Sequence, residues 1–343
     1  MPIVNQAQIA RSLKVSRATV SKALKDADDI SEGMKKRVRD LAEKFNYIPH
    51  YHASNLQSKR TKTIGVVVPD ISYSFFAFAV DGIMDAAQRS GYQVILTVSR
   101  EKVDIERKNI LTLLSMRVDG LLVAVSKETR NIQIFEKVRR SEIPLVFFDR
   151  SVGGLGFSSV GIDDREAARR LVDFVLRKGY RRIWHIAGSS GIDIGRNRRA
   201  GYGDALTRRG IRIRKDWITE GGFTREDGRR GFRELHRRGA LPDVVFGAND
   251  QIALGAYDAM RELGIRYPEQ VGVVAFSHRE YANIMSPSLT IIHVDPCLLG
   301  RKAMELLLRH MDHPGTRSRR LRIPAEIEEG ESLLKRGDSV QGD

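Results

Sequence analysis

The sequence contains almost no cysteine and no long apolar stretch. Its 343 residues include a single cysteine, Cys297, which excludes an internal disulfide and a cysteine-rich metal site. No apolar run approaches the roughly 20 residues that a membrane-spanning helix needs. The N-terminus is polar and basic and lacks the apolar core of a signal peptide. We therefore expect a cytoplasmic protein that does not contact a membrane.

Enzyme signatures are also missing. There is no phosphate-binding P-loop, no HExxH zinc motif and no GxSxG nucleophile motif. The glycines of SVGGLGFSSVG (151–161) do not follow a strand and open a helix, as a dinucleotide-binding loop requires. The histidines are scattered, and the spacing of His50 and His52 is wrong for one helical face and favours phosphate contacts over metal. We expect no catalytic residue, no cofactor and no metal site.

Positive charge, by contrast, is plentiful and unevenly distributed. The chain has 58 Lys and Arg against 43 Asp and Glu, a formal net charge of +15. Residues 1–62 hold 13 basic and 6 acidic side chains, so positive charge per residue is about four times denser there than in the remainder. This head predicts a phosphate-binding surface. The arginine-rich stretches at 229–239 and 317–322 are interpreted as solvated surface.

Residues 9–25, IARSLKVSRATVSKALK, predict two short helices joined by a tight turn. Apolar residues recur at helical spacing, at Ile9, Ala10 and Leu13 and then at Ala18, Val20, Ala23 and Leu24. Ser16 stands where the second helix needs an N-cap, and it is also expected to contact DNA. Outward positions carry short hydroxyls and long cations, which reach base edges and phosphates: Arg17, Thr19, Ser21, Lys22 and Lys25. Arg17, Ala18 and Lys22 are expected nearest to the bases. An ordinary surface helical hairpin is the alternative.

A third helix at 31–45, capped by Ser31, completes a predicted head domain at 1–48. A polar segment follows at 49–62, with Leu56 as its one large apolar residue. Such a segment is too short and polar to fold alone. On DNA we expect the stretch around Ala53 and Leu56 to form a short helix, with Leu56 wedged between base pairs in the minor groove. A solvent-exposed linker leucine is the alternative.

From Ile64 onward, continuous apolar runs alternate with amphipathic stretches. The runs GVVV, YQVILTV, GLLVAV, PLVFF, IWHIAG, VVFGA and VGVVAF predict strands that are buried on both faces. Their alternation with helical patterns predicts an α/β class with doubly wound parallel sheets. The helix endings RSGY before a strand at 92 and RKGY before a strand at 183 indicate two similar lobes. The tail at 337–343 has no heptads for a coiled coil.

Seven motifs, found in order from about 3 to 331, make the chain resemble the LacI family of transcription regulators. They are VSRATVSKAL, NYIP followed by HASNL, TKTIGVVVPDIS, RVDGLLV, IPLVFFDR, GANDQIALGA and SPSLT. FFDR and VAFSH look most similar to the Bacteroidetes-type branch. The resemblance implies a homodimeric repressor with a helix-turn-helix head and a periplasmic-binding-protein-like domain at 63–336. It also implies a pseudo-palindromic double-stranded operator, and a small effector that is a sugar or sugar derivative.

The same resemblance implies how the effector domain is divided. Lobe 1 would hold about 63–161 and 294–321, and lobe 2 about 162–292 and 323–336. The chain would cross between them near Gly161–Asp163, Ile291–His293 and Arg322–Pro324.

The effector site is expected in a cleft between these lobes, because doubly wound sheets bind ligands at the carboxyl ends of their strands. Residues at those ends with suitable side chains are Ser72, Phe75, Asp149, Asn249 and Ser277. By the resemblance, Arg198 is the arginine that grips the effector and Phe223 an aromatic that packs on its ring. Two structural alternatives stay open: Asp250 caps the following helix, and Phe76 belongs to the core.

Two departures from the family pattern affect these expectations. Ser277 replaces a common acidic residue, which leaves Arg198 less compensated and favours an anionic ligand, unless Asp149 supplies the carboxylate. Lys14 stands in the turn where the family usually has glycine. A non-glycine residue in the left-handed region costs about 1 kcal/mol there, but a lysine could contact phosphate.

Two rival protein classes share part of this pattern. A solute-binding protein of a transport system has the two-lobed fold, but it would need a signal peptide and would have no basic head. A Rossmann-type enzyme would need a phosphate-binding glycine loop and a catalytic base. The sequence therefore favours a transcription regulator over both.

Overall fold

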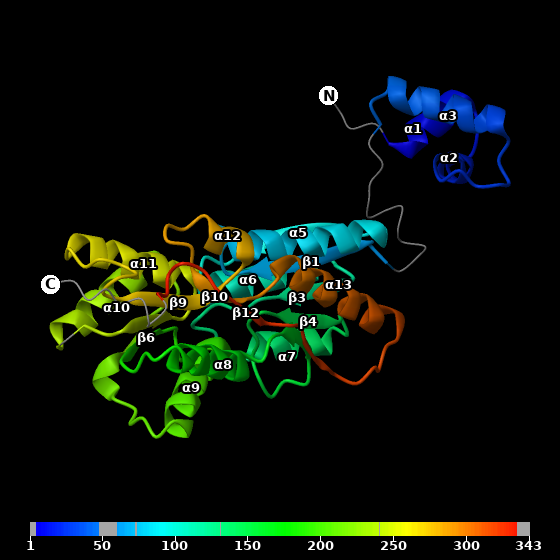
Figure 1. Ribbon diagram of the computed structural model, residues 1–343. Helices are drawn as coiled ribbons and strands as arrows, with labels where there is room; N and C mark the ends of the chain where they lie inside the picture. The colour runs from blue at the N-terminus through cyan, green and yellow to red at the C-terminus, as the bar shows by residue number, and fades with distance from the viewer. Residues whose placement is uncertain (1–4, 48–59, 73, 131, 240, 335–343) are drawn as a thin grey trace. The chain divides into compact units, whose positions relative to one another are not determined.

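The chain forms two compact units, Met1–Thr61 and Lys62–Asp343 (Figure 1). The computed structural model describes residues 5–47, 60–72, 74–130, 132–239 and 241–334. Ala53 and Leu56 of the predicted hinge, with His50 and His52, lie outside the described residues. Within these ranges, no helix has both the length and the apolar character needed to cross a bilayer.

The first unit is a bundle of three helices. Ile9, Val20 and Val38, one from each helix, are fully buried and form the centre of its core. Ala18, which fits both the apolar stripe and the outward side of the second helix in the sequence, is exposed, because Val20 and Ala23 fill the buried side. The three helices are α1 (Gln6–Leu13), α2 (Arg17–Leu24) and α3 (Glu32–Lys44).

The second unit contains two six-stranded sheets, and we call the first sheet with its helices lobe 1. Its strand order is β11-β5-β4-β3-β1-β2, and all pairs are parallel. Helix α13 packs on α5 and on β3, β4 and β5, while α6 packs on β1, β2 and α7. The strands are β1 (Thr63–Val68), β2 (Gln93–Val98), β3 (Gly120–Val123), β4 (Leu145–Phe148), β5 (Ser158–Gly161) and β11 (Arg320–Arg322). The helices are α5 (Ser74–Arg89), α6 (Val103–Ser115), α7 (Gln133–Arg140) and α13 (Pro296–Asp312).

The second sheet with its helices is lobe 2, and its order, β12-β10-β9-β8-β6-β7, repeats the pattern of lobe 1. The predicted doubly wound α/β fold is confirmed. One strand departs from it: β12 is antiparallel to β10. The strands are β6 (Ile183–Ala187), β7 (Ile218–Glu220), β8 (Val244–Gly247), β9 (Gly272–Ser277), β10 (Thr290–His293) and β12 (Glu326–Glu328). The helices are α8 (Asp164–Arg177), α9 (Asp193–Arg208), α10 (Arg225–Arg237), α11 (Asp250–Glu262), α12 (Arg279–Asn283) and the 3-10 turn η1 (Lys215–Trp217).

The predicted burial of the strands holds for most of them and fails for one. The strands β1, β3, β4, β6, β8 and β9 are buried along their whole length. The stretch YQVILTV, also expected to be buried on both faces, gives β2, whose residues are exposed or half-buried. The reason is its position, because β2 is the edge strand and pairs with β1 alone.

Three short segments connect the lobes: 162–163, 294–295 and 323–325. The second crossing comes after β10 rather than at Ile291–His293, because Ile291 and Ile292 pair with β9 and β12 inside lobe 2. Arg322 forms an ion pair with Asp163, which ties the first crossing to the third.

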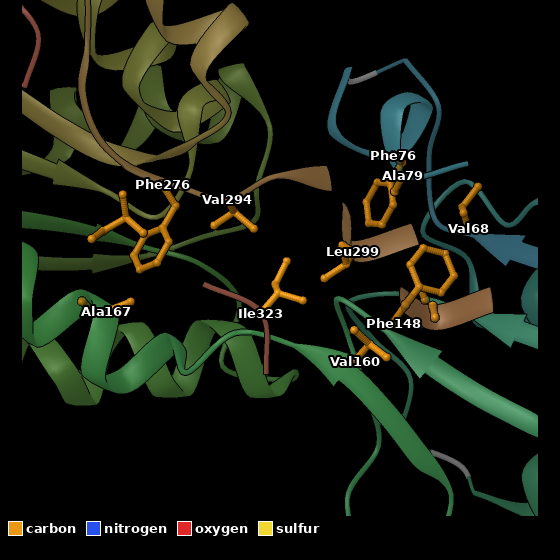
Figure 2. Close-up of a cluster of buried hydrophobic side chains, with 14 of the residues drawn as sticks. Val68, Phe76, Ala79, Phe148, Val160, Ala167, Phe276, Val294, Leu299 and Ile323 are labelled. Atoms are coloured by element: carbon orange, nitrogen blue, oxygen red, sulfur yellow. The ribbon is translucent and has the colours of Figure 1, made fainter. Parts of the chain in front are cut away.

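The hydrophobic core continues through these crossings (Figure 2). Phe276 of lobe 2 and Leu299 and Phe148 of lobe 1 belong to one buried cluster. Val294 and Ile323, from two of the crossing segments, lie between them in that cluster. The two lobes therefore share one apolar core where the chain crosses between them.

Candidate functional site

The outward side of α2 carries the predicted nucleic-acid contacts. Arg17, Ala18 and Lys22 are exposed, as is Lys25 at the C-cap, whereas Thr19 and Ser21 are half-buried. Lys22 forms an ion pair with Asp29, and both side chains are more than half exposed. An exposed pair of this kind contributes little to stability, so phosphate or a base edge can replace Asp29 at small cost.

The turn before α2 has the expected construction. Ser16 Oγ accepts a hydrogen bond from the backbone N–H of Thr19 at 3.0 Å, so the predicted N-cap is confirmed. Lys14 has a φ of 53° and lies in the left-handed region, as predicted from the glycine that the family usually has at this position. Its exposed side chain projects from the turn that presents the first residues of α2.

A cleft lies between the two lobes, with about 1000 Å³ of empty space including its open mouth. Most of the predicted effector residues line it: Phe75, Asp149, Arg198, Phe223, Asn249 and Ser277. Ser72 is not among the lining residues. It is exposed, and its backbone N–H donates to Asp70 Oδ1 at 2.7 Å, which leaves Asp70 as the polar side chain of that loop in the cleft.

Arg198 is buried and makes two hydrogen bonds within lobe 2. Its Nε donates to Asp164 Oδ1 at 2.8 Å, and Nη1 donates to the carbonyl oxygen of Ala248 at 2.5 Å. The guanidinium carbon lies 3.7 Å from the centre of the Phe276 ring. Asp164 forms an ion pair with this arginine, so the serine at position 277 does not leave Arg198 uncompensated and does not favour an anionic ligand.

Asn249, rather than Asp250, is the N-cap of α11. Its Oδ1 accepts from the backbone N–H of Ile252 at 3.0 Å, and its Nδ2 donates to the carbonyl of Phe223 at 3.0 Å. Asp250 is the first residue inside the helix and accepts from Ser277 Oγ at 2.9 Å. Burial raises the pKa of Asp250. The predicted N-cap was wrong by one residue. The serine at position 277 does not leave this part of the cleft without a carboxylate, because its hydroxyl holds the carboxylate of Asp250 in place.

Asp149 has an unusual backbone at the end of β4. Its φ is 58°, and the N–H of Arg150 donates to the carbonyl of Phe148 at 2.6 Å, closing a three-residue turn. Turns of this kind with positive φ are rare and strained, and such strain gathers at functional positions. Burial raises the pKa of Asp149 to about 6, although Arg150 and Arg198 oppose the shift. This carboxyl therefore changes charge close to neutral pH.

Several cleft residues were missed by the sequence reasoning. Arg150 Nη1 donates to Glu101 Oε1 at 2.7 Å, and its guanidinium lies 5.3 Å from the ring centre of Phe76 and 5.0 Å from that of Phe223. Phe76 is both a core residue and a lining residue. The ammonium of Lys127 has no ion-pair partner among the described residues. Glu101 and Lys127 also follow strand ends, so the same rule extended by a few residues would have found them.

Carboxylates outnumber cations on the cleft wall. The acidic lining residues are Asp70, Glu101, Asp149, Asp164 and Asp250, and the basic ones are Lys127, Arg150 and Arg198. Both guanidinium groups already have carboxylate partners. The remaining carboxylates offer hydrogen-bond acceptors beside four phenylalanines, an arrangement that suits a neutral ring with many hydroxyl groups.

Comparisons with known proteins match the two units separately and the chain as a whole. A family model described as bacterial regulatory proteins of the lacI family matches residues 7–50. A second, described as periplasmic binding proteins and sugar binding domain of the LacI family, matches residues 61–331. The HTH-type transcriptional repressor CytR of Escherichia coli K12 is 32% identical over 91% of both chains. The ribose operon repressor of Haemophilus influenzae is 29% identical over 91% of this chain and 93% of its own.

Solved structures agree with this similarity. The Lac repressor dimer bound to operator and the anti-inducer ONPF superposes with a TM-score of 0.84 at 25% identity, over 97% of this chain and 99% of that one. The transcriptional regulator CelR in complex with cellobiose superposes with a TM-score of 0.73 at 27% identity, over 96% and 99%. The relatives named here are regulators rather than enzymes. The resemblance to one branch of the family stays a prediction.

Proposed function

The chain belongs to the LacI family of bacterial transcription regulators, and on that premise we propose that it is a repressor whose operator binding is controlled by a carbohydrate in the cleft between its lobes. The observation that carries the proposal is the pairing of two sites in one chain. One is the exposed Arg17, Ala18 and Lys22 surface of α2, and the other is a cleft rich in carboxylates and aromatic rings.

For the DNA-binding part, α2 acts as the recognition helix of a helix-turn-helix. Its N-terminal residues lie in the major groove, where Arg17 and Ala18 meet base edges and Lys22 exchanges Asp29 for DNA. Lys14 and Lys25, at the two ends of this segment, contact phosphates and contribute affinity rather than sequence preference. Ala53 and Leu56 act in the minor groove, as proposed for the hinge.

For the effector, the cleft favours a neutral sugar or sugar derivative over an acidic one. Sugar hydroxyls would donate to Asp149 and Asn249 and accept from Lys127, while Phe75 and Phe223 would cover the apolar face of the ring. A carboxylate or phosphate would meet five acidic side chains at the cleft wall, with both arginines already paired. The effector class follows from this excess of acceptors.

The protein acts as a homodimer in the cytoplasm, because a pseudo-palindromic operator presents two half-sites to two heads. Carbohydrate metabolism is the process that such a repressor would regulate. A solute-binding protein of a transport system remains the second candidate, and only its two-lobed domain favours it. That candidate has no use for a basic three-helix head.

The test is a selection of bound duplexes from random DNA, followed by titrations of the selected site at fixed salt. We expect a pseudo-palindromic site. Lys22→Ala should weaken specific binding, and Arg17→Ala should change the preferred base at one position in each half-site. Loss of a good base contact costs about 1–3 kcal/mol.

The matched control is Lys36→Ala, which removes the same charge from an exposed position on α3. It should lower affinity slightly and equally for all sequences. If Arg17→Ala and Lys22→Ala behave like Lys36→Ala, α2 is not the recognition helix. If no duplex is enriched, the protein is not a sequence-specific regulator.

A further inference from the structure

His278 belongs to lobe 2 but docks on a helix of lobe 1. It follows the last residue of β9, and its Nε2 lies 2.7 Å from Oγ of Ser74, the first residue of α5. Its ring also meets the ring of Phe78 edge to face, with the centroids 5.1 Å apart. The residue is only 1% exposed, so water does not compete for these contacts. Helix α12, which begins at Arg279, lies beside the N-terminal end of α5 (Figure 1).

A neighbour in lobe 2 fixes the orientation of this ring. His278 Nδ1 is 3.0 Å from Glu280 Oε2, so Nδ1–H donates to that carboxylate. With Nδ1–H donating to Glu280, Nε2 accepts a hydrogen bond from the Ser74 hydroxyl. His278 is therefore held in one orientation as a support between the lobes.

Both ends of this contact are one residue away from the cleft. Phe75, which follows Ser74, lines the cleft from lobe 1, and Ser277, which precedes His278, lines it from lobe 2. We infer that His278 is a positioning residue that docks lobe 2 on α5 and sets the resting width of the cleft. The inference rests on the proposed effector role of that cleft. It implies that the Ser74–His278 bond limits how readily an effector enters the cleft.

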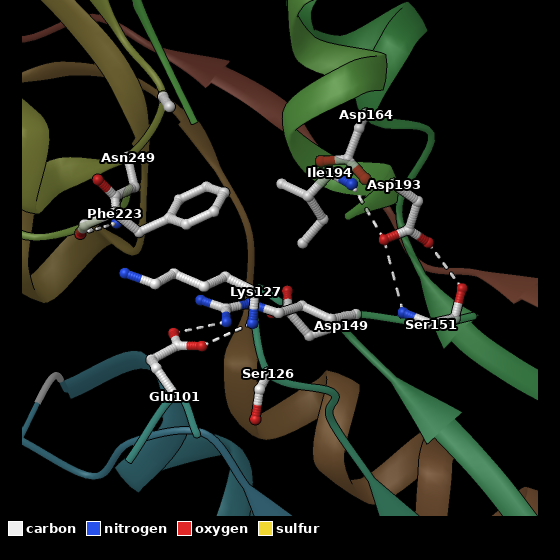
Figure 3. Close-up of polar contacts among 12 residues, drawn as sticks. Glu101, Ser126, Lys127, Asp149, Ser151, Asp164, Asp193, Ile194, Phe223 and Asn249 are labelled. Atoms are coloured by element: carbon white, nitrogen blue, oxygen red, sulfur yellow. Dashed lines mark hydrogen bonds and ion pairs between the residues drawn. The ribbon is translucent and has the colours of Figure 1, made fainter. Parts of the chain in front are cut away.

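A second contact between the lobes, remote from His278, allows this inference to be tested. Ser151, after β4 in lobe 1, donates from Oγ to Asp193 Oδ2 at 2.6 Å, and Asp193 is the first residue of α9 in lobe 2 (Figure 3). Ser74 and His278 take no part in this contact. If the lobes move as units, weakening the His278 contact must also loosen the Ser151 contact.

The experiment is hydrogen–deuterium exchange followed by mass spectrometry on the full chain, without DNA or effector. Ser74→Ala removes the hydroxyl, and His278→Phe keeps a ring against Phe78 but cannot form the bond. Each should raise the exchange rates of 277–284 about fivefold, the change expected from one hydrogen bond. The same increase should appear at 149–153 and 189–195, around the Ser151–Asp193 contact. Ser90→Ala is the matched control, because Ser90, directly after α5, donates from Oγ to the Ala86 carbonyl of that helix and bridges no lobes.

Each result decides the matter. Faster exchange at both places in Ser74→Ala, and none in Ser90→Ala, supports the inference. Faster exchange confined to 74–80 and 277–284 shows a purely local role and overturns it, as does no change at all. Ser74→Ala decides alone if His278→Phe fails to fold. Because no DNA is present, failure of the operator experiment would remove the proposed function without changing this measurement.

Discussion

In lobe 2 the arginine of the cleft pairs and stacks within its own lobe, whereas in lobe 1 the cations of the cleft reach toward lobe 2 or have no ion-pair partner among the described residues. Arg198 pairs with Asp164 and lies over a ring of its own lobe. Arg150 pairs with a glutamate of lobe 1 but places its guanidinium beside Phe223 of lobe 2. Lys127, also from lobe 1, has no ion-pair partner among the described residues.

This difference indicates a division of labour between the two walls. The lobe 2 wall is preorganised, so its groups need little rearrangement when a ligand binds. The lobe 1 wall makes contacts to lobe 2 that a ligand can replace, and Ser151 and Ser74 add to those contacts. A ligand would therefore act mainly by exchanging the lobe 1 contacts for its own.

The sharpest test of this comparison removes one arginine from each wall. Arg198→Ala leaves Asp164 buried without its partner, which should lower the free energy of unfolding by about 3–5 kcal/mol. Arg150→Ala should cost clearly less, because Glu101 is 22% exposed and can be hydrated. Urea unfolding at pH 7 measures both. The double variant Arg198→Met with Asp164→Leu should recover most of the loss, and equal losses for the two single variants would contradict the comparison.

A second test uses pH to reach the interior of lobe 2. Burial lowers the pKa of His185 to about 4, while its Nδ1–H donates to the Phe246 carbonyl at 2.9 Å. In the unfolded chain the ring titrates near 6.5. The stability contributed by the neutral ring is therefore complete above pH 6.5 and is lost as the pH falls toward 4, by about 3 kcal/mol. Urea unfolding at pH 7 and 4.5 should show this loss, and His185→Phe should reduce it. An unchanged slope in the variant would place the acid sensitivity elsewhere.

The lobe 1 wall should respond to pH in the opposite direction. The pKa of Asp149 is raised to about 6 in the folded chain, so its contribution is complete below its ordinary value and is lost as the pH rises through 6. Asp149→Asn should therefore raise the free energy of unfolding at pH 7 by about 3 kcal/mol and have no such effect at pH 4. The exposed Asp81→Asn serves as the control. A destabilised Asp149→Asn variant at pH 7 would show that Arg150 needs the charge.

The smallest expected effect concerns Asn249, which was predicted as a ligand contact and is also structural. Asn249→Ala removes the cap of α11 and the tie to Phe223, at a cost of about 1–2 kcal/mol. Asn249→Ser should keep the cap and lose only the hydrogen bond to Phe223, so its stability should fall between that of the wild type and that of Asn249→Ala. Thermal unfolding separates them. If Asn249→Ala were as stable as the wild type, the residue would serve the ligand alone.

Much of the cleft could be predicted, because parallel strands bring their carboxyl ends to one edge. That rule placed Asp149 and Asn249 correctly, and it would also have reached Glu101 and Lys127. It failed for Ser72, since the loop after β1 turns this side chain outward and leaves Asp70 inside. Capping was predictable at Ser16, where one hydroxyl precedes the helix. At α11 it was not, since Asn249 and Asp250 are both good caps.

By itself, the sequence determined the periodicities, the basic head and the order of strands and helices. These properties depend on neighbours along the chain, and they are enough to identify two lobes and a helix-turn-helix. The tertiary structure alone decided which polar groups meet. The pairing of Arg198 with Asp164, of Arg150 with Glu101 and of Ser74 with His278 joins residues 34, 49 and 204 positions apart. Such pairings depend on how distant elements pack within each lobe and, for Ser74 and His278, between the lobes, and burial then makes each of them favourable or costly.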